Sequence, residues 1–198
     1  MNTSKNVIFD LEGVLIDWNP AHVYLEVLDG DQNKMNSFFD QICTMDWNEN
    51  QDAGYPLQQA TEDRVKMFPQ YEEWIRMYYG RWEEMLGNAI EGTVDVLHKL
   101  IADPNYRVIA LTNWSAETFP LAFARFAFFH LFDCLLVSPT DTMRNPFPYI
   151  YPLPLARSGF NPSEPLFIHH TPSTISPTSP LRIQRLLFKH PPPLHPHL

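Results

Sequence analysis

The chain has 198 residues, of which 44% are hydrophobic and 19% are charged, a composition typical of a globular protein and not of a disordered one. Its formal net charge of -9 argues against nucleic acid as a partner, and no apolar run approaches the roughly 18 residues that a membrane span needs. Two distant cysteines, Cys43 and Cys134, and a start without a signal-peptide pattern lead us to expect a cytoplasmic protein.

The first half of the chain combines one strand with a helical block. The apolar run NVIFD at residues 6–10 predicts a strand buried on both faces of a parallel sheet. Residues 21–87 place apolar side chains at helical spacing between charged ones, which predicts a helical subdomain. Within that block, the polar stretch 48–56 contains Gly54 and Pro56, so we predict a loop there.

Helices and strands alternate after this block. We predict helices at 92–106 and 115–129, the second N-capped by Ser115, and strands at 107–113, 133–138 and 165–170. The alternation predicts an α/β fold with a Rossmann-like, doubly wound parallel sheet, built from residues 1–17 and 88–170, with a helical cap at 18–87.

The end of the chain has a different composition. Prolines recur every few positions after residue 170, so we expect 171–198 to form a poorly ordered tail in which only 181–188 could be helical. Residues 139–198 carry 14 of the 19 prolines but only two of the 23 acidic residues. This composition break within one chain needs an explanation before a motif in that part is interpreted.

Two acidic residues follow the first predicted strand. Asp10 ends it, Glu12 comes two residues later, and Gly13 allows backbone to approach a ligand closely. Ligands of parallel sheets sit at the carboxyl ends of the strands. One carboxylate could attack an electrophile, the other could deliver and remove a proton, and the pair could attract a divalent cation. The alternative is that Asp10 only ends a strand and Glu12 lies in an exposed loop.

Polar residues also end the strand predicted at 107–113. Thr112 and Asn113 supply a hydroxyl and an amide just before a helix, a combination that suits a phosphate-binding corner. Ordinary N-capping is the alternative. Trp18 and Trp114 follow the two motifs directly, so both are candidates for contact with a substrate.

Together, these stretches are similar to a known superfamily. VIFDLEGVLIDWNP (7–20) and ALTNWSAETFPLA (110–122) resemble the first and second motifs of the haloacid dehalogenase (HAD) superfamily of hydrolases, which inserts a helical cap between them. ICTMDWNENQDAG and RWEEMLGNAIEGT resemble cap sequences of a bacterial subgroup related to sugar-phosphate phosphatases and 2-haloacid dehalogenases. The resemblance implies Asp10 as nucleophile, Glu12 as acid and base, and Thr112 with Asn113 on the phosphate.

The resemblance also implies a magnesium site, for which the sequence is incomplete. The ligands would be Asp10, the backbone carbonyl of Glu12 and a later acid. The family's third motif has a lysine where RNPFPYIY has Asn145, and its fourth has two acids where FIHHT has His169 and His170. Imidazole suits zinc, copper or nickel better than Mg²⁺. A mixed Asp10/His169 site, an inert histidine pair and a degenerate C-terminal third are the alternatives.

The function implied is hydrolysis of a small phosphate ester through an aspartyl-phosphate on Asp10, with Mg²⁺ as cofactor. Glu12 favours phosphate chemistry, because dehalogenases of the superfamily have no acid at its position. A 2-haloacid dehalogenase with the same nucleophile, and a HAD-fold protein whose catalysis is impaired by Asn145, His169 and His170, are the alternatives. We expect a small-molecule substrate and neither nucleic acid nor a membrane as partner.

Overall fold

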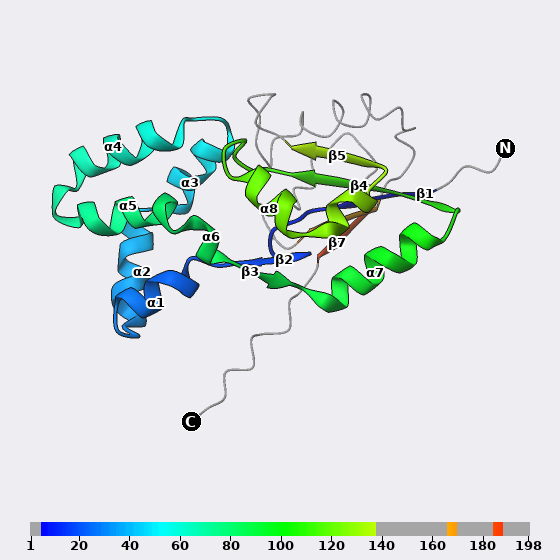
Figure 1. The fold of residues 1–198 in the computed structure, drawn as a ribbon, viewed down its shortest axis with the longest axis horizontal. Coiled ribbons are helices and arrows are strands. Elements are labelled where there is room, and N and C mark those ends of the chain that lie inside the picture. Colours follow the sequence, from blue (N-terminus) through cyan, green and yellow to red (C-terminus); the bar gives the residue numbers. More distant parts are fainter. Residues whose placement is uncertain (1–4, 138–165, 170–183, 188–198) are drawn as a thin grey trace.

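Five parallel strands form the central sheet of the protein, whose computed structural model describes residues 5–137, 166–169 and 184–187 (Figure 1). Their order across the sheet is β5-β4-β1-β6-β7, which confirms the predicted α/β fold with a parallel sheet. The strands are β1 (Lys5–Phe9), β4 (Tyr106–Thr112), β5 (Cys134–Val137), β6 (Leu166–His169) and β7 (Gln184–Leu187).

The central strands β1 and β4 are apolar along most of their length. Residues 7–9 and 108–112 are buried, as strands covered on both faces require. Val7 pairs with Val108 of β4 on one side and with Leu166 of β6 on the other. This register brings the carboxyl ends of β1, β4 and β6 to one edge of the sheet.

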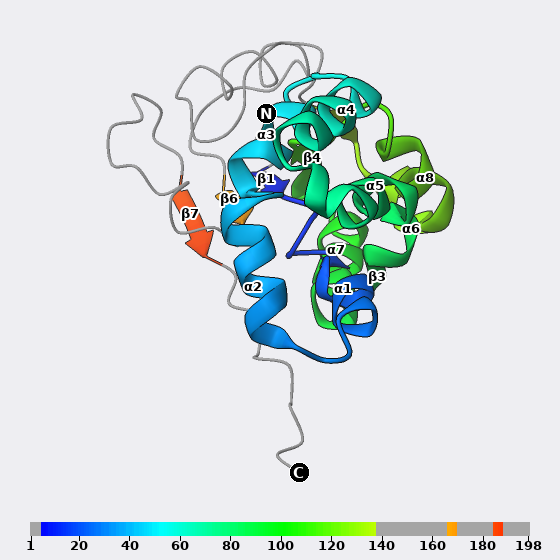
Figure 2. The same cartoon turned by 90° about the vertical axis from the view of Figure 1, so that its left-hand side faces the viewer.

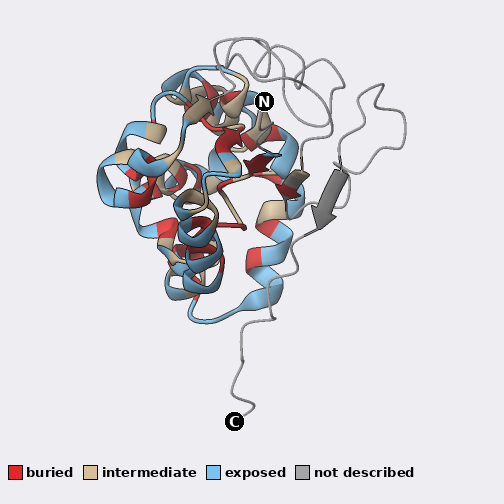
Figure 3. Ribbon diagram, turned by 90° about the vertical axis from the view of Figure 1, so that its right-hand side faces the viewer, coloured by how far each residue is buried: buried red, intermediate tan, exposed pale blue. Residues whose placement is uncertain are grey.

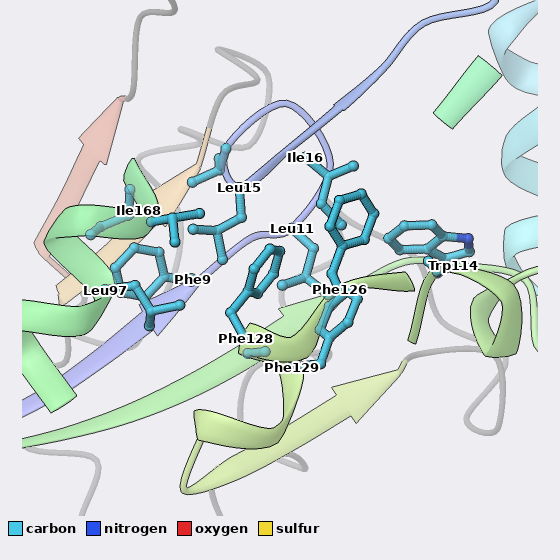
Figure 4. Close-up of a cluster of buried hydrophobic side chains, with 14 of the residues drawn as sticks. Phe9, Leu11, Leu15, Ile16, Leu97, Trp114, Phe126, Phe128, Phe129 and Ile168 are labelled. Atoms are coloured by element: carbon cyan, nitrogen blue, oxygen red, sulfur yellow. The ribbon is translucent and has the colours of Figure 1, made fainter. Parts of the chain in front are cut away.

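Two helices and a short 3₁₀ helix complete the core around the sheet. Helix α7 (Glu91–Ala102) contributes Leu97 to the same hydrophobic cluster as Phe9, and α8 (Phe119–Arg125) contributes Ala122. The 3₁₀ helix η2 (Ala127–Leu131) adds Phe128 and Phe129. Figure 4 shows how the labelled aromatic and aliphatic side chains of this cluster gather beside the sheet.

A second lobe of helices, here called the cap, lies at one end of the sheet (Figures 1 and 2). The antiparallel strands β2 (Ile16–Trp18) and β3 (Leu86–Ala89) join the two parts. Between these strands the chain forms α1 (Ala21–Val27), α2 (Gln32–Gln41), α3 (Met45–Asp52), α4 (Leu57–Met67), η1 (Pro69–Tyr71), α5 (Glu72–Gly80) and α6 (Trp82–Met85).

The sheet and the cap each have their own apolar interior. The cap cluster includes the buried Tyr24, Phe38, Trp47 and Ile75, and it is separate from the cluster around the sheet. Buried positions accordingly occur in the interior of both parts, while the outer helix faces are exposed (Figure 3). Two partly buried aromatic residues, Trp18 and Tyr79, pack against both clusters and therefore mark the boundary between cap and sheet.

Helix α3 occupies part of the stretch that we predicted as a loop at 48–56. The hydroxyl of Thr44 accepts a hydrogen bond from the Trp47 N–H, and Asp46 lies in the first turn, so a side-chain cap and the helix dipole both favour the helix. Asn48 and Gln51 of this helix are buried despite their polarity. The predicted loop is therefore confined to residues 53–56, and the prediction was wrong for 48–52, where polar residues form the last turns of a helix.

Helix α8 begins four residues later than the predicted helix at 115–129. The carbonyl of Ser115 accepts hydrogen bonds from the N–H groups of Thr118 and Phe119, which closes a turn before the helix. Its own N–H bonds to Asp52 of the cap. Ser115 therefore holds the loop that faces the cap, and it is not the N-cap that we predicted.

Strand β7 lies within residues 171–198, where we expected a tail and at most a helix at 181–188. Its backbone continues the parallel sheet beside β6, with Leu166 opposite Gln184. A short apolar run cannot be assigned to helix or strand from periodicity alone, and here the free edge of β6 provides the pairing partner. No helix in the described ranges is long and apolar enough to cross a membrane.

Candidate functional site

Asp10 is the first residue after the central strand β1. Its backbone N–H donates a 2.9 Å hydrogen bond to the carbonyl of Ile168, which ties it to the end of β6. Its Oδ1 accepts a 2.9 Å hydrogen bond from the Leu11 N–H. The side chain is partly buried. Asp10 thus lies at the carboxyl edge of the sheet, where a parallel sheet binds its ligands.

A tight turn after Asp10 determines the position of Glu12. The carbonyl of Leu11 accepts hydrogen bonds from the N–H groups of Leu15 and Ile16, at 2.8 and 3.1 Å. Gly13 has a positive φ of 67°, a conformation that a side chain at this position would disfavour, and its N–H donates to Ile16. The turn folds the chain back so that Glu12 is partly buried. It is not the fully exposed loop residue of the alternative interpretation.

The environment of Glu12 favours its protonated form. Desolvation is the largest cause that raises its pKa well above the usual value, followed by the negative charges of Asp52 and Asp10. A carboxyl group that keeps its proton beside a second carboxylate can act as a proton donor. The arrangement therefore pairs a potential nucleophile, Asp10, with a potential general acid.

Thr112 and Asn113 lie at the same edge of the sheet, at the end of β4. The register pairs Phe9 with Ala110, so Thr112 lies just beyond the end of β1. Thr112 is only 1% exposed, and its hydroxyl donates a long 3.5 Å hydrogen bond to the carbonyl of Asn113. The Asn113 Oδ1 is buried without a hydrogen-bond partner among the described residues. The side-chain oxygens of both residues thus have a weak partner or none within the described part of the chain.

The two tryptophans that we predicted as substrate contacts have different environments. Trp114 is 1% exposed and lies in the hydrophobic cluster of the sheet (Figure 4). It packs beside Trp82 and donates its Nε1–H to the hydroxyl of Thr118 at 3.1 Å. Its ring therefore packs in the core, and contact with a substrate stays a prediction for this residue. Trp18 is partly buried, and its Nε1 has no partner in the described ranges.

The cap brings a third carboxylate toward this edge. Asp52, the last residue of α3, accepts a 3.2 Å hydrogen bond from the Ser115 N–H and a 2.9 Å hydrogen bond from Asn48 Nδ2. The pKa of Asp52 is raised to about 7 in total, because desolvation and, to a smaller extent, the charge of Glu49 raise it, while the Ser115 hydrogen bond lowers it. Asp52 therefore contributes to the negative potential around Glu12.

Sequence reasoning missed a network of polar residues in the cap. The hydroxyl of Tyr78 donates to Asn48 Oδ1 at 3.0 Å, and the hydroxyl of Tyr79 donates to Gln51 Oε1 at 3.0 Å. Asn48, Gln51 and Asp52 are spaced i, i+3 and i+4 along α3, so they share one face of the helix. That spacing was the signal in the sequence that could have revealed the buried polar face.

The described residues supply only part of a magnesium site. No group of three histidine, cysteine, aspartate or glutamate residues within the described ranges could hold a metal ion. Asp10 and the carbonyl of Glu12 would provide two oxygen ligands. Mg²⁺ often binds one or two carboxylates together with substrate phosphates and waters, so this donor set fits a weak, substrate-completed site. Asn145 and His170 lie outside the described residues, and only the backbone of His169 is described.

Comparisons with known proteins identify the fold. No protein-family model and no curated protein sequence matches the chain. A HAD family enzyme from Bacteroides thetaiotaomicron, solved with magnesium and inorganic phosphate, is similar with a TM-score of 0.68 and 20% identity over 94% of both chains. A predicted HAD-like family hydrolase from Porphyromonas gingivalis has a TM-score of 0.66 and 19% identity, covering 93% of this chain and 91% of its own.

A dehalogenase is also similar, with a TM-score of 0.62 and 18% identity over 93% of both chains. An enzyme solved with inorganic phosphate and a dehalogenase are therefore both similar in structure to this chain. At this level of identity, the likeness defines the fold. The chain has the fold of the haloacid dehalogenase enzymes, the superfamily that its first two motifs resemble.

Proposed function

We propose that the protein hydrolyses a small phosphate ester, with Asp10 as the nucleophile. The observation that carries this proposal is the pairing of Asp10, at the carboxyl end of β1, with a partly buried Glu12 whose pKa is raised by desolvation and by neighbouring carboxylates. An alkoxide leaving group needs a proton, and a protonated Glu12 can supply it. A halide leaving group needs none, so the pairing favours a phosphatase over a 2-haloacid dehalogenase.

The reaction has two balanced steps. In the first, a carboxylate oxygen of Asp10 attacks phosphorus, the bond from phosphorus to the ester oxygen breaks, and Glu12 gives its proton to the departing alcohol. In the second, Glu12, now a carboxylate, takes a proton from a water molecule whose oxygen attacks phosphorus. The bond from phosphorus to Asp10 breaks, which releases inorganic phosphate and restores both carboxyl groups.

Groups at the sheet edge support the phosphoryl group during these steps. Thr112 and Asn113 are close to the end of β1, and we propose that they donate hydrogen bonds to the phosphoryl oxygens. A Mg²⁺ ion held by Asp10 and the carbonyl of Glu12 would neutralise negative charge on those oxygens. The HAD family enzyme from Bacteroides thetaiotaomicron that was solved with magnesium and inorganic phosphate supports this assignment by its similar fold.

Turnover of two substrates by the same protein tests the proposal. The purified chain is assayed with p-nitrophenyl phosphate and with 2-chloropropionate, each in Mg²⁺ and in EDTA, beside an Asp10→Asn variant. We expect phosphate release that falls by about 10³-fold or more in the variant, and no chloride release. Chloride release that depends on Asp10, without phosphate release, would identify a dehalogenase instead. No turnover from folded protein would support the catalytically impaired alternative.

A further inference from the structure

A buried hydrogen bond closes the loop between β4 and α8. The indole Nε1–H of Trp114 donates to the hydroxyl of Thr118 at 3.1 Å, and the two residues are 1% and 5% exposed. Inside the loop, the carbonyl of Ser115 accepts a 3.2 Å hydrogen bond from the Thr118 N–H. Because the side-chain bond is buried, water does not compete for it, and it restricts the backbone between its two ends.

The ring of Trp114 is held by aromatic neighbours from two elements. Its centroid lies 5.9 Å from that of Trp82 in the cap helix α6 and 5.7 Å from that of Phe119, the first residue of α8. Figure 4 shows the indole at one end of the cluster around the sheet. Tilted and edge-on contacts of this kind restrict the orientation of a buried ring, so the Nε1–H stays directed at Thr118.

The side chains of Thr112 and Asn113 are weakly held by their own hydrogen bonds within the described residues. The Thr112 hydroxyl makes a long 3.5 Å hydrogen bond to the carbonyl of Asn113. The Asn113 Oδ1 is buried and has no partner in the described ranges. Asn113 immediately precedes Trp114, so the conformation of the loop affects where its side chain lies. The loop must therefore be fixed by other groups if the corner is to keep one geometry.

We propose that Trp114 and Thr118 are positioning residues, whose hydrogen bond holds the loop 113–118 in the conformation in which Thr112 and Asn113 can donate to a phosphoryl group. The inference rests on the proposed phosphatase function and adds the groups that keep its phosphate corner in place. Both residues act through the backbone of Asn113. A bond with only a structural role would stabilise the fold and leave the affinity for phosphate unchanged, so the two roles can be distinguished.

Two variants of Thr118 separate its hydroxyl from its shape. Thr118→Val keeps the shape and removes the acceptor, whereas Thr118→Ser keeps the hydroxyl, and neither removes a side-chain cap of α8. We expect Thr118→Val to raise the Kd for inorganic phosphate about tenfold, and Thr118→Ser to stay within about twofold of the wild type, in calorimetric titrations with Mg²⁺. As a control, Thr61→Val removes a buried hydroxyl that bonds to the Leu57 carbonyl in α4, and it should leave the Kd unchanged.

Replacement of Asn113 tests whether the bond acts through this residue. Asn113→Ala removes the proposed phosphate donor, so Thr118→Val should have little further effect on the Kd in that background. Trp114→Phe removes the donor of the same bond and keeps an aromatic ring, so it should also raise the Kd, and Thr118→Val should add little to it. If Thr118→Val lowers only the free energy of unfolding in urea, or if its effect on the Kd adds fully to that of Asn113→Ala, the inference is wrong.

Hydrogen exchange separates this inference from the proposed function. The N–H groups of Ser115, Glu117 and Thr118 all donate to partners within or across the loop, so their exchange rates report its closure without any substrate. Thr118→Val should speed exchange at these three positions and Thr118→Ser should not, with exchange in β1 unchanged in both. Unchanged exchange in Thr118→Val would overturn the inference even if the wild type hydrolyses phosphate esters. If the wild type neither binds phosphate nor hydrolyses its esters, the proposed function fails, and faster exchange in Thr118→Val would still support the role of the bond in holding the loop.

Discussion

The backbone N–H of Ser115, in the loop after the sheet strand β4, donates a 3.2 Å hydrogen bond to the carboxylate of Asp52 at the end of the cap helix α3. A second bond runs the other way, because the Leu57 N–H at the start of cap helix α4 donates to Glu117 Oε1 at 2.9 Å. One carboxylate from each part thus holds a backbone N–H of the other. These two bonds are among the contacts that hold the cap against the sheet.

The raised pKa of Asp52 predicts a pH-dependent stability that Asp52→Asn should weaken. Between the ordinary pKa of 3.8 and the folded value of about 7, the folded protein binds a proton that the unfolded chain does not. The free energy of unfolding therefore falls as pH rises through this window. After allowance for partial solvent exposure, we expect the wild type to lose about 2 kcal/mol more than Asp52→Asn between pH 4 and pH 8.

Urea unfolding of both proteins across this pH range measures the difference. Asp46→Asn removes an exposed carboxylate from the same helix and serves as the control for the loss of a charge there. Parallel pH curves for the wild type and Asp52→Asn would contradict the prediction.

Glu117 should stabilise the start of α4 from outside the cap. The residue before this helix, Pro56, provides no side-chain cap, so the Leu57 N–H depends on the Glu117 carboxylate for its partner. Glu117→Ala should lower the free energy of unfolding by about 1 kcal/mol and speed hydrogen exchange at Leu57, while Glu117→Gln should keep most of the effect because its amide oxygen still accepts. If hydrogen exchange at Leu57 is as slow in Glu117→Ala as in Glu117→Gln, the contact does not hold the cap.

Replacement of Glu12 should affect substrates according to their leaving group. Glu12→Gln cannot donate a proton, so kcat/KM for an alkyl phosphate should fall by about 10²-fold or more. The loss should be much smaller for p-nitrophenyl phosphate, whose leaving group departs without protonation. The ratio of the two losses is measured under identical conditions. A uniform loss for both substrates would show that Glu12 acts by another means than acid catalysis.

A carboxylate at position 169 should strengthen magnesium binding. The β1–β6 register pairs Phe9 with Ile168, so residue 169 follows at the position beside Asp10 on the neighbouring strand. Because Mg²⁺ prefers oxygen ligands, His169→Asp should lower the Kd for Mg²⁺ by about tenfold, measured calorimetrically in the presence of inorganic phosphate. His22→Asp, in the cap helix α1, adds the same group elsewhere and should leave the Kd unchanged. If neither variant binds Mg²⁺ more tightly than the wild type, the ion binds away from β6.

The sequence predicts the sheet and the residues at its edge well, and there is a physical reason for this. Strand β4 contains the continuous apolar run 108–111, and such runs leave few alternatives to a buried parallel strand. Asp10 and Glu12 could be found because a strand end and a glycine turn are both local in sequence. Local chemistry therefore accounts for one half of the candidate site.

The cap half of the site depends on contacts between distant residues, which the sequence does not reveal. Asn48 and Gln51 are polar, and only their bonds to Tyr78 and Tyr79, about thirty positions away, explain why they are buried. Trp114 follows the phosphate-corner motif directly, yet packing against Trp82 draws its ring into the core. Tertiary contacts override local pattern at each of these positions.

The account depends most directly on a covalent bond between Asp10 and phosphorus. The protein is mixed with p-nitrophenyl phosphate and Mg²⁺, quenched with acid during turnover, digested, and examined by mass spectrometry for the peptide that contains Asp10. We predict that this peptide gains the mass of one phosphoryl group, that Asp10 carries it, and that Asp10→Asn abolishes it. Turnover without any phosphorylated peptide, or with the group on another residue, would contradict the assignment of Asp10 as nucleophile.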